Sequence, residues 1–249
     1  MLADRNPQIL AATAEVLKAG GHVVATHPVD VASRQSVQEL AKVAAGLGEV
    51  INVVHTAGLS PVQASAKAIL AVDLVGVALV LEVFAEVIAA GSAGVVVSSM
   101  GGHMLPALDP DADRALAFTP ADELLDLPIL SPEAVPNSGV AYALSKRANH
   151  LRVQAAAVTW GDRGARVNAI SPGIVLTPLA KEEMSGPVAE GYQAMIANSA
   201  AGRVGTTDEI AVAAAYLLGP DAGFVTGADL LIDGGVIAAI GAGRIQLSL

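Results

Sequence analysis

Short β-branched runs alternate with longer apolar or amphipathic stretches along nearly the whole chain of 249 residues. The runs are bounded by Gly, Pro or polar residues, as strands are, and the stretches between them have the length of helices. Strands that alternate with helices form βαβ units and a parallel sheet with helices on both faces. The sequence predicts strands at 22–26, 50–54, 94–98, 165–170 and 228–232.

Helices are expected between these strands, and capping residues mark several of their ends. Ser33 and the run 206–209 open two of them, and Gly20-Gly21 closes the first, as N-caps and C-caps do. The helical stretches are 7–19, 33–47, 64–90, 138–160 and 207–218. We find no internal repeat and no low-complexity linker, so we expect one α/β domain over residues 1–249 with a doubly wound parallel sheet.

Composition excludes several functional classes. Hydrophobic residues make up 53% of the chain and charged residues 15%, which is the balance of a folded protein. With 14 basic against 24 acidic residues, we expect no binding to nucleic acid or to anionic membranes. Cysteine is absent, which excludes disulfides, cysteine nucleophiles and thiolate metal sites, and no metal site is expected.

The sequence also favours a cytoplasmic protein. No basic segment followed by an apolar run stands at its start, so no secretory signal is expected. The most apolar long stretch, 69–90, is interrupted by Asp73, Glu82 and Glu86. Charges in such a stretch favour a buried helix over a membrane span.

Residues 103–139 interrupt the alternation of strands and helices. They are rich in Pro and Asp and have weak periodicity. An irregular segment this long inside a domain is often a lid over a site, and the alternative is a surface insertion without a role. We favour a substrate lid, because the segment joins two stretches that carry chemistry.

The most informative motif is Tyr142-Ala-Leu-Ser-Lys146. Residues four apart lie on one face of a helix. An ammonium group beside a phenol stabilises the phenolate, as a general acid or base requires. The alternative is a half-buried tyrosine whose lysine neighbour reaches solvent.

Three further segments follow predicted strands. They are Ser98-Ser99, the run 55–58 (His-Thr-Ala-Gly) and the run 168–178, which contains Pro-Gly. Ligands bind at the carboxyl ends of strands in open parallel sheets. Alone, Ser98-Ser99 is better explained as ordinary loop or helix-cap serines, and the other two segments are also compatible with ordinary turns.

Taken in order, these motifs resemble the short-chain dehydrogenase/reductase family. The order is a strand ending in Ala-Gly, a strand ending in Ser-Ser, Y-x-x-x-K, N-A-x-x-P-G-x-x-x-T, and T-G-x-x-x-x-x-D-G-G at 226–235. The resemblance covers residues 1 to about 236 and implies a Rossmann-like fold. It implies that Tyr142 exchanges a proton with the substrate oxygen, that Lys146 holds the nicotinamide ribose, and that Ser99 hydrogen-bonds the substrate, with Ser98 as the second choice.

The resemblance also implies a cofactor site built after the strands. Residues 172–177 would hold the nicotinamide carboxamide, 57–58 would line the adenosine–ribose path, and 30–31 would contact the adenine. The individual residues are Asp30, Val31, Ala57, Gly58, Pro172, Gly173, Val175 and Thr177, together with Tyr142 and Lys146.

Cofactor choice depends on the first residues. The run 1–5 resembles the end of the family's second strand, where an acidic residue such as Asp4 binds a ribose 2′-hydroxyl and repels a 2′-phosphate. NAD is therefore expected, with NADP as the alternative, because Arg5 offers a partner for that phosphate. Alternatively, Asp4 serves the helix that Asn6-Pro7 opens.

The chain departs from the family pattern at three places. The first strand and its T-G-x-x-x-G-x-G turn are not found, so we expect a gap in the sheet with exposed apolar edges. Either the sequence starts late relative to a longer protein, or the truncated form is genuine. Asp73 stands where the family often has Asn, and we assign it to a catalytic relay beside Lys146, a helix residue at a bend being the alternative. His55 replaces an Asn that is mainly structural.

Two functions remain in competition. The first is an oxidoreductase that interconverts a secondary alcohol and a ketone. Its long insert resembles that of hydroxysteroid dehydrogenase/carbonyl reductase members, so a steroid-like or bulky apolar substrate is expected. The second is a non-catalytic oligomeric pseudoenzyme that lacks the glycine turn.

Because the helical stretches 64–90 and 138–160 are apolar nearly all round, we expect a homodimer or homotetramer, with the tail 236–249 at a subunit contact.

Overall fold

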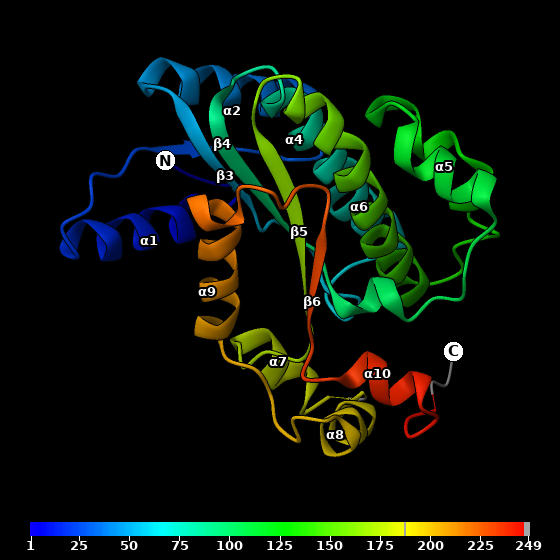
Figure 1. The fold of residues 1–249 in the computed structure, drawn as a ribbon. Helices are drawn as coiled ribbons and strands as arrows, with labels where there is room; N and C mark the ends of the chain where they lie inside the picture. Colours follow the sequence, from blue (N-terminus) through cyan, green and yellow to red (C-terminus); the bar gives the residue numbers. More distant parts are fainter. Residues whose placement is uncertain (187, 247–249) are drawn as a thin grey trace.

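The computed structural model describes residues 1–186 and 188–246 and places their strands in two parallel sheets. The larger sheet has the order β3-β4-β5-β6 and the smaller pairs β1 with β2. Figure 1 shows the four strands of the larger sheet running side by side. The strands are β1 (Leu2–Asp4), β2 (Thr26–Pro28), β3 (Val50–His55), β4 (Ile88–Val97), β5 (Arg166–Pro172) and β6 (Asp229–Ile232).

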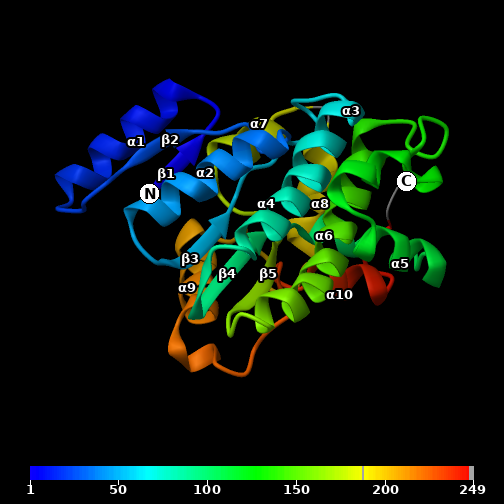
Figure 2. The same ribbon diagram turned by 90° about the horizontal axis from the view of Figure 1, so that it is seen from above.

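Helices cover both faces of the larger sheet. Helix α9 (Thr207–Leu218) packs against β4 and β5, while α4 (Gly76–Phe84) and α6 (Ser138–Gly161) lie on the opposite face (Figures 1 and 2). Helix α1 (Pro7–Ala19) packs on β1 and β2, and α2 (Arg34–Leu47) packs on α4. The doubly wound α/β fold expected from the sequence is thereby confirmed.

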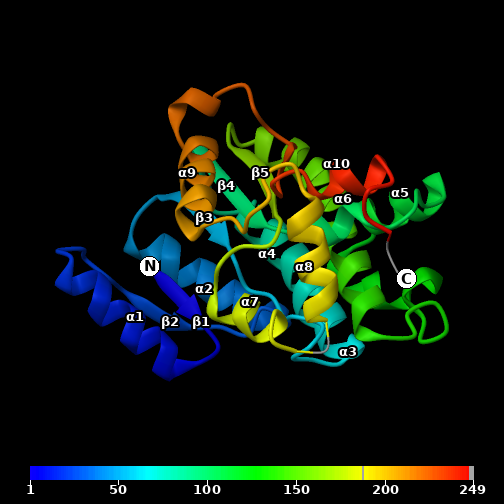
Figure 3. The ribbon, with the colours of Figure 1, turned by 90° about the horizontal axis from the view of Figure 1, so that it is seen from below.

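Shorter helices complete the chain. In Figure 3, α7 and α8 lie in front of the carboxyl ends of the sheet, with α10 beside them. The tail from Val236 packs within its own chain, where Val236, Ala239 and Ile245 join a cluster with Met100 and Ile174. These elements are α3 (Ala66–Ile69), the π-helical η1 (Leu70–Val75), η2 (Met100–His103), α7 (Pro178–Glu183), α8 (Ala189–Asn198), η5 (Pro220–Ala222) and α10 (Val236–Gly241). The subunit contact expected for 236–249 stays a prediction, and its last residues, 247–249, lie outside the described residues.

Two element boundaries differ from the sequence expectation. The strand expected at 22–26 lies at Thr26–Pro28, because its register with β1 pairs Leu2 with Thr26, while Val23 is fully exposed. The helix expected at 64–90 ends at Phe84, and Ile88 begins β4. The Ala and Val residues of that stretch are compatible with a helix and with a strand, and the pairing of Ile88 with Val50 places it in the sheet.

The segment 103–139 is not irregular. It forms α5 (Pro110–Phe118), η3 (Ala121–Asp126) and η4 (Pro128–Leu130), and α5 packs against α6. Leu116 and Leu124 are fully buried in the main core. The insert therefore covers apolar surface of α4 and α6, which the sequence analysis assigned to a subunit contact. Its role as a substrate lid stays a prediction.

Buried polar contacts attach this insert to the two long helices. The guanidinium of Arg152 on α6 donates to the carbonyls of Leu116 and Thr119, at 3.1 and 2.8 Å. Glu82 on α4 accepts from the Ala121 amide at 2.9 Å and from Arg152 at 3.2 Å. These bonds satisfy backbone groups that packing would otherwise leave unpaired in the core.

Among the strands that the structure describes, none joins the larger sheet to the smaller one. The free edge of β3 leaves Ile51 and Val54 exposed by 60% and 50%. A cavity of about 660 Å³ lies between this edge, β1 and α2. The expected gap with exposed apolar edges is thus confirmed. Within the described residues, no helix combines the length and the apolar character needed to cross a bilayer.

Close packing of Trp160 on β4 generates a stability prediction. A methyl group added at Gly94 would lie 2.6 Å from the Trp160 ring. We expect Gly94→Ala to lower the free energy of unfolding by about 1–3 kcal/mol, because the ring has to shift in a filled core. The matched control is Gly46→Ala in α2, where an added methyl meets no atom within 4 Å. Denaturant unfolding checks both variants, and equal stabilities would contradict this account of the core.

Candidate active site

The motif segments converge at one edge of the larger sheet. Strands β3, β4 and β5 are parallel, so the residues that follow them lie at the same edge. The run 56–59 follows β3, Ser98 and Ser99 follow β4, and residues 173–177 follow β5. Helix α6 lies alongside, against β5 and η2. The sequence motifs are therefore brought together as a cluster.

Tyr142 and Lys146 lie in the first half of α6. Asn137 caps this helix by accepting a hydrogen bond from the Val140 amide at 2.9 Å. Tyr142 is half-buried and Lys146 is almost fully buried. The Lys146 Nζ lies 5.2 Å from the centroid of the Tyr142 ring. The pair thus shares one helix face, as the spacing predicts, and a cation stands beside the phenol.

Asp73 holds the Lys146 ammonium group. Its Oδ2 lies 3.0 Å from Lys146 Nζ, and both side chains are buried. Its Oδ1 accepts a hydrogen bond from the Leu59 amide at 2.8 Å. Burial raises the pKa of the Asp73 carboxyl, and attraction to Lys146 offsets part of that rise. Asp73 lies in the π-helical η1, a rare backbone form that is frequent at functional sites.

The two serines after β4 have different environments. The Ser98 hydroxyl is buried and donates to the Lys146 carbonyl at 3.0 Å, so it fixes α6 against the sheet. The Ser99 hydroxyl is half-buried and accepts from the Gly101 amide at 3.1 Å. A methyl group at Gly101 would lie 3.2 Å from the Tyr142 ring and 3.5 Å from Ser99 Oγ. This proximity favours Ser99 over Ser98 as the substrate contact.

The cavity beside β3 collects the cofactor residues expected near the adenosine. Its walls include Asp4, Asp30, Val31, Ala57 and Gly58. Asp4 also accepts from the Asn6 amide at 2.6 Å, so its expected helix-end role is observed beside its place in the cavity. The five residues come from β1, the turn after β2 and the turn after β3. Their convergence on one cavity fits a nucleotide that spans these turns.

Two further observations test whether a nicotinamide cofactor fits. A methyl group at Gly58 would lie 3.1 Å from Asp73 Oδ2 and 3.3 Å from Lys146 Nζ, so only a residue without a side chain leaves room between this cavity wall and the Asp73–Lys146 pair. His55 lines the same cavity, and its buried Nε2 has no hydrogen-bond partner in the described part of the chain. Both features suit a ligand that brings polar groups to this wall.

Residues 172–177 lie at the carboxyl edge of the sheet and also make contacts that stabilise the fold. A methyl group at Gly173, just after β5, would lie 2.6 Å from the Cα of Asp233, just after β6. Only glycine at position 173 lets these two segments approach so closely. Val175 forms an isolated parallel bridge with Gly205, and the Thr177 hydroxyl accepts from the Ala180 amide at 3.1 Å. Pro172 ends β5. These four residues lie outside the walls of the cavity, so their contact with the nicotinamide stays a prediction.

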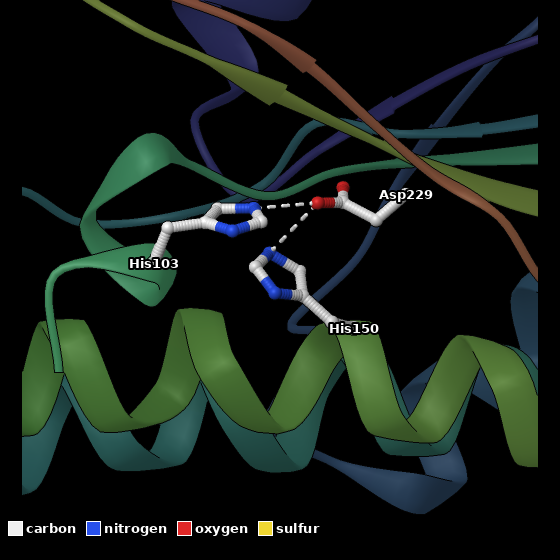
Figure 4. Close-up of side chains that lie close together, drawn as sticks. All are labelled: His103, His150 and Asp229. Atoms are coloured by element: carbon white, nitrogen blue, oxygen red, sulfur yellow. Dashed lines mark hydrogen bonds and ion pairs between the residues drawn. The ribbon is translucent and has the colours of Figure 1, made fainter. Parts of the chain in front are cut away.

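A cluster missed by the sequence analysis lies next to these groups. His103 Nε2 is 2.7 Å from Asp229 Oδ2 (Figure 4). His150 Nε2 is 2.8 Å from Ser171 Oγ. Burial lowers the pKa of His150, and the Asp229 carboxylate opposes that shift. The available signal was the spacing of His150, four residues after Lys146. Its partners lie far away in sequence, which no local pattern reveals.

The buried His55 generates a pH prediction. Burial, with a smaller contribution from positively charged Lys146, lowers the pKa of His55 to about 4 from 6.5. Between these values the unfolded chain binds more protons, so stability falls as the pH drops from 6.5 to 4, by about 3 kcal/mol at most. We expect His55→Asn to lose a smaller part of its unfolding free energy than the parent between pH 7 and 4.5. Parallel losses in denaturant titrations would refute this origin.

Comparison with known proteins identifies relatives that match nearly the whole chain. A family model described as Enoyl-(Acyl carrier protein) reductase matches residues 128–237. The short-chain dehydrogenase/reductase bsc3 of Alternaria brassicicola is 38% identical over 96% of this chain and 87% of its own length. The 3-alpha-hydroxysteroid dehydrogenase/carbonyl reductase of Comamonas testosteroni is 31% identical over 92% of this chain and 93% of its own.

Solved structures give the same result for the fold. A 3-alpha-hydroxysteroid dehydrogenase from Pseudomonas sp. B-0831, solved with NADH, has a TM-score of 0.75 and 27% identity, over 96% of this chain and 98% of that one. A short-chain type dehydrogenase/reductase from Mycobacterium ulcerans has a TM-score of 0.73 at 23% identity, over 95% and 79%, and shows the fold alone. The pseudoenzyme alternative finds no support among relatives named as dehydrogenases and reductases. From the Tyr142–Lys146 pair at the sheet edge and from relatives that match nearly its whole length, the chain belongs to the short-chain dehydrogenase/reductase family of NAD(P)-dependent oxidoreductases.

Proposed function

We propose that this protein interconverts a secondary alcohol and a ketone at the Tyr142–Lys146 pair. The observation that carries the proposal is the buried chain of contacts from Asp73 to Lys146 to the Tyr142 ring. It begins next to Gly58, which lines the cavity that suits a nucleotide, and at its other end Gly101 lies close to both the Tyr142 ring and the Ser99 hydroxyl. A phenol that lies beside a fixed cation and near a half-buried hydroxyl is equipped to exchange a proton with a substrate oxygen.

A nicotinamide cofactor bound at this site would supply or accept the hydride. Tyr142 donates a proton to the substrate oxygen in the direction of reduction and removes it in the direction of oxidation. The Lys146 ammonium stabilises the phenolate that forms after donation, and Asp73 keeps the ammonium in place. Ser99 donates a hydrogen bond to the substrate oxygen and orients it toward Tyr142.

The cofactor half of the proposal rests on the cavity residues. NAD is favoured, because the Asp4 carboxylate at the cavity wall attracts a ribose hydroxyl and repels a phosphate. NADP remains the alternative through Arg5, which lines the same cavity. Asp30, Val31, Ala57 and Gly58 would hold the adenosine, while Pro172, Gly173, Val175 and Thr177 would hold the nicotinamide end.

For the substrate, a steroid-like or other bulky apolar alcohol is proposed. The sequence relative from Comamonas testosteroni and the structural relative from Pseudomonas are both named as hydroxysteroid dehydrogenases.

The proposal extends to a cytoplasmic homodimer or homotetramer. Exposed apolar residues of α9 and the turn after it, among them Val212 and Phe224, offer a contact surface besides the tail.

The first experiment tests the acid–base role. We expect Tyr142→Phe to lower kcat by about 100-fold or more in steroid alcohol oxidation with NAD, because the proton loses its carrier. The matched control is Tyr216→Phe on the exposed side of α9, which should keep the parent rate. A Tyr142→Phe variant that turned over as fast as its parent would overturn the proposal.

The second experiment tests the cofactor site. Titration of NADH with the parent protein should change the NADH fluorescence until it reaches a plateau, because the cavity residues converge on one site. Asp4→Asn should raise the Kd for NADH and lower that for NADPH, shifting their ratio by about tenfold, because the repulsion of a 2′-phosphate is removed. An unchanged ratio would remove Asp4 from cofactor selection, and no binding at millimolar NADH would favour the pseudoenzyme.

A further inference from the structure

Four polar side chains from four separate elements meet between α6 and the sheet. His103 ends η2, His150 lies on α6, Ser171 lies on β5, and Asp229 begins β6. Figure 4 shows both imidazoles directed at the same oxygen of Asp229. The Nε2 atoms of His103 and His150 lie 2.7 and 3.5 Å from that Oδ2. This cluster has no part in the proton transfer assigned to Tyr142.

The geometry points to a site in which His103, His150 and Asp229 bind one divalent transition-metal ion of the Zn²⁺ class. Their three donor atoms lie within 4.8 Å of one another. Zn²⁺ holds nitrogen and oxygen ligands at about 2.0–2.1 Å in a tetrahedron, which places neighbouring donor atoms about 3.3 Å apart. The distance from His150 to Asp229 already matches, and His103 has to withdraw from Asp229 by about half an ångström.

Neighbouring groups orient the donor atoms for an ion. The Ser171 hydroxyl donates to Asp229 Oδ1 at 2.8 Å, so the other oxygen, Oδ2, faces the two rings. Such second contacts fix a ligating carboxylate and are worth about 10–100-fold in metal affinity. The two rings stand with centroids 4.5 Å apart and planes tilted by 37°, and the Nε2 atoms of both lie within 3.5 Å of Asp229 Oδ2. Ion binding requires each ring to carry its proton on Nδ1. His150 Nε2 therefore exchanges its 2.8 Å hydrogen bond with Ser171 Oγ for the ion, and His103 Nε2 exchanges its 2.7 Å hydrogen bond with Asp229 Oδ2.

The backbone brings the two histidines together through a glycine. A methyl group at Gly102 would lie 2.7 Å from His150 Cε1 and from the Arg147 amide nitrogen. Only a residue without a side chain lets η2 approach α6 so closely. His103, the next residue, then reaches the same point as His150. Its side chain is 30% exposed, which leaves a route from solvent and room for a water as the fourth ligand.

Two nitrogens and one carboxylate select the kind of ion. Imidazole suits Zn²⁺ and its transition-metal neighbours, whereas Mg²⁺ and Ca²⁺ prefer oxygen ligands. A bound ion would tie η2, α6 and β6 together next to Ser99, which caps η2, and Lys146, one turn before His150. Occupancy would thus stiffen the support of the catalytic groups.

The test uses the full chain, stripped with a chelator and without cofactor or substrate. Calorimetric titration with Zn²⁺ should show one saturable site per chain with a Kd of about 10 µM or tighter, unaffected by millimolar Mg²⁺. Added Zn²⁺ should raise the melting temperature, since the ion binds the folded chain. The absence of a saturable site would overturn the inference.

Variants localise the site. Asp229→Asn and His103→Gln should each weaken Zn²⁺ binding by at least about 100-fold, because each removes one of three ligands. The matched control is His22→Gln, an exposed histidine after α1 that should leave the affinity unchanged. Melting curves in chelator show whether each variant is folded. His103, whose side chain is 30% exposed, keeps the test valid if Asp229→Asn unfolds. Unchanged affinity in folded His103→Gln, or equal loss in His22→Gln, would place the ion elsewhere.

Discussion

The buried ion pair between Asp73 and Lys146 is the contact on which the geometry of the candidate active site depends. It joins three separate pieces of chain, because Asp73 also accepts from the Leu59 amide in the turn after β3. Removing two charges from water is costly, and truncating one partner of a buried pair typically costs about 3–5 kcal/mol. The pair therefore makes the position of the ammonium beside Tyr142 a property of the folded core and not of a mobile side chain.

A second buried network determines how the insert relates to this core. Arg152 and Glu82 satisfy backbone groups at the ends of α5 and η3, while Leu116 and Leu124 fill the space between them. The apolar surfaces of α4 and α6 are thereby covered from within the chain. A second subunit that packed on α4 and α6 would have to displace the insert. Contacts between subunits are therefore expected on other surfaces.

Local patterns predicted what is local. The spacing of Tyr142 and Lys146 gave their shared helix face, and the strand ends gave the common edge of the sheet. Asp73 was assigned beside Lys146 from its family position, and the direct contact is observed. The meeting of His150 with Asp229 and the packing of Leu116 depend on tertiary contacts between distant segments, which periodicity does not encode. The end of α4 at Phe84 was missed because Ala and Val suit helix and strand alike.

The break between the two sheets has a thermodynamic consequence. One wall of the cavity belongs to the unit of β1, β2 and α1, and the other belongs to the large sheet, with no strand ladder between them. The free energy that separates the unit of β1, β2 and α1 from the large sheet then comes largely from side-chain packing. A nucleotide that touched both walls would supply the missing linkage, so amide hydrogen exchange in α1 and β2 would report directly on cofactor occupancy.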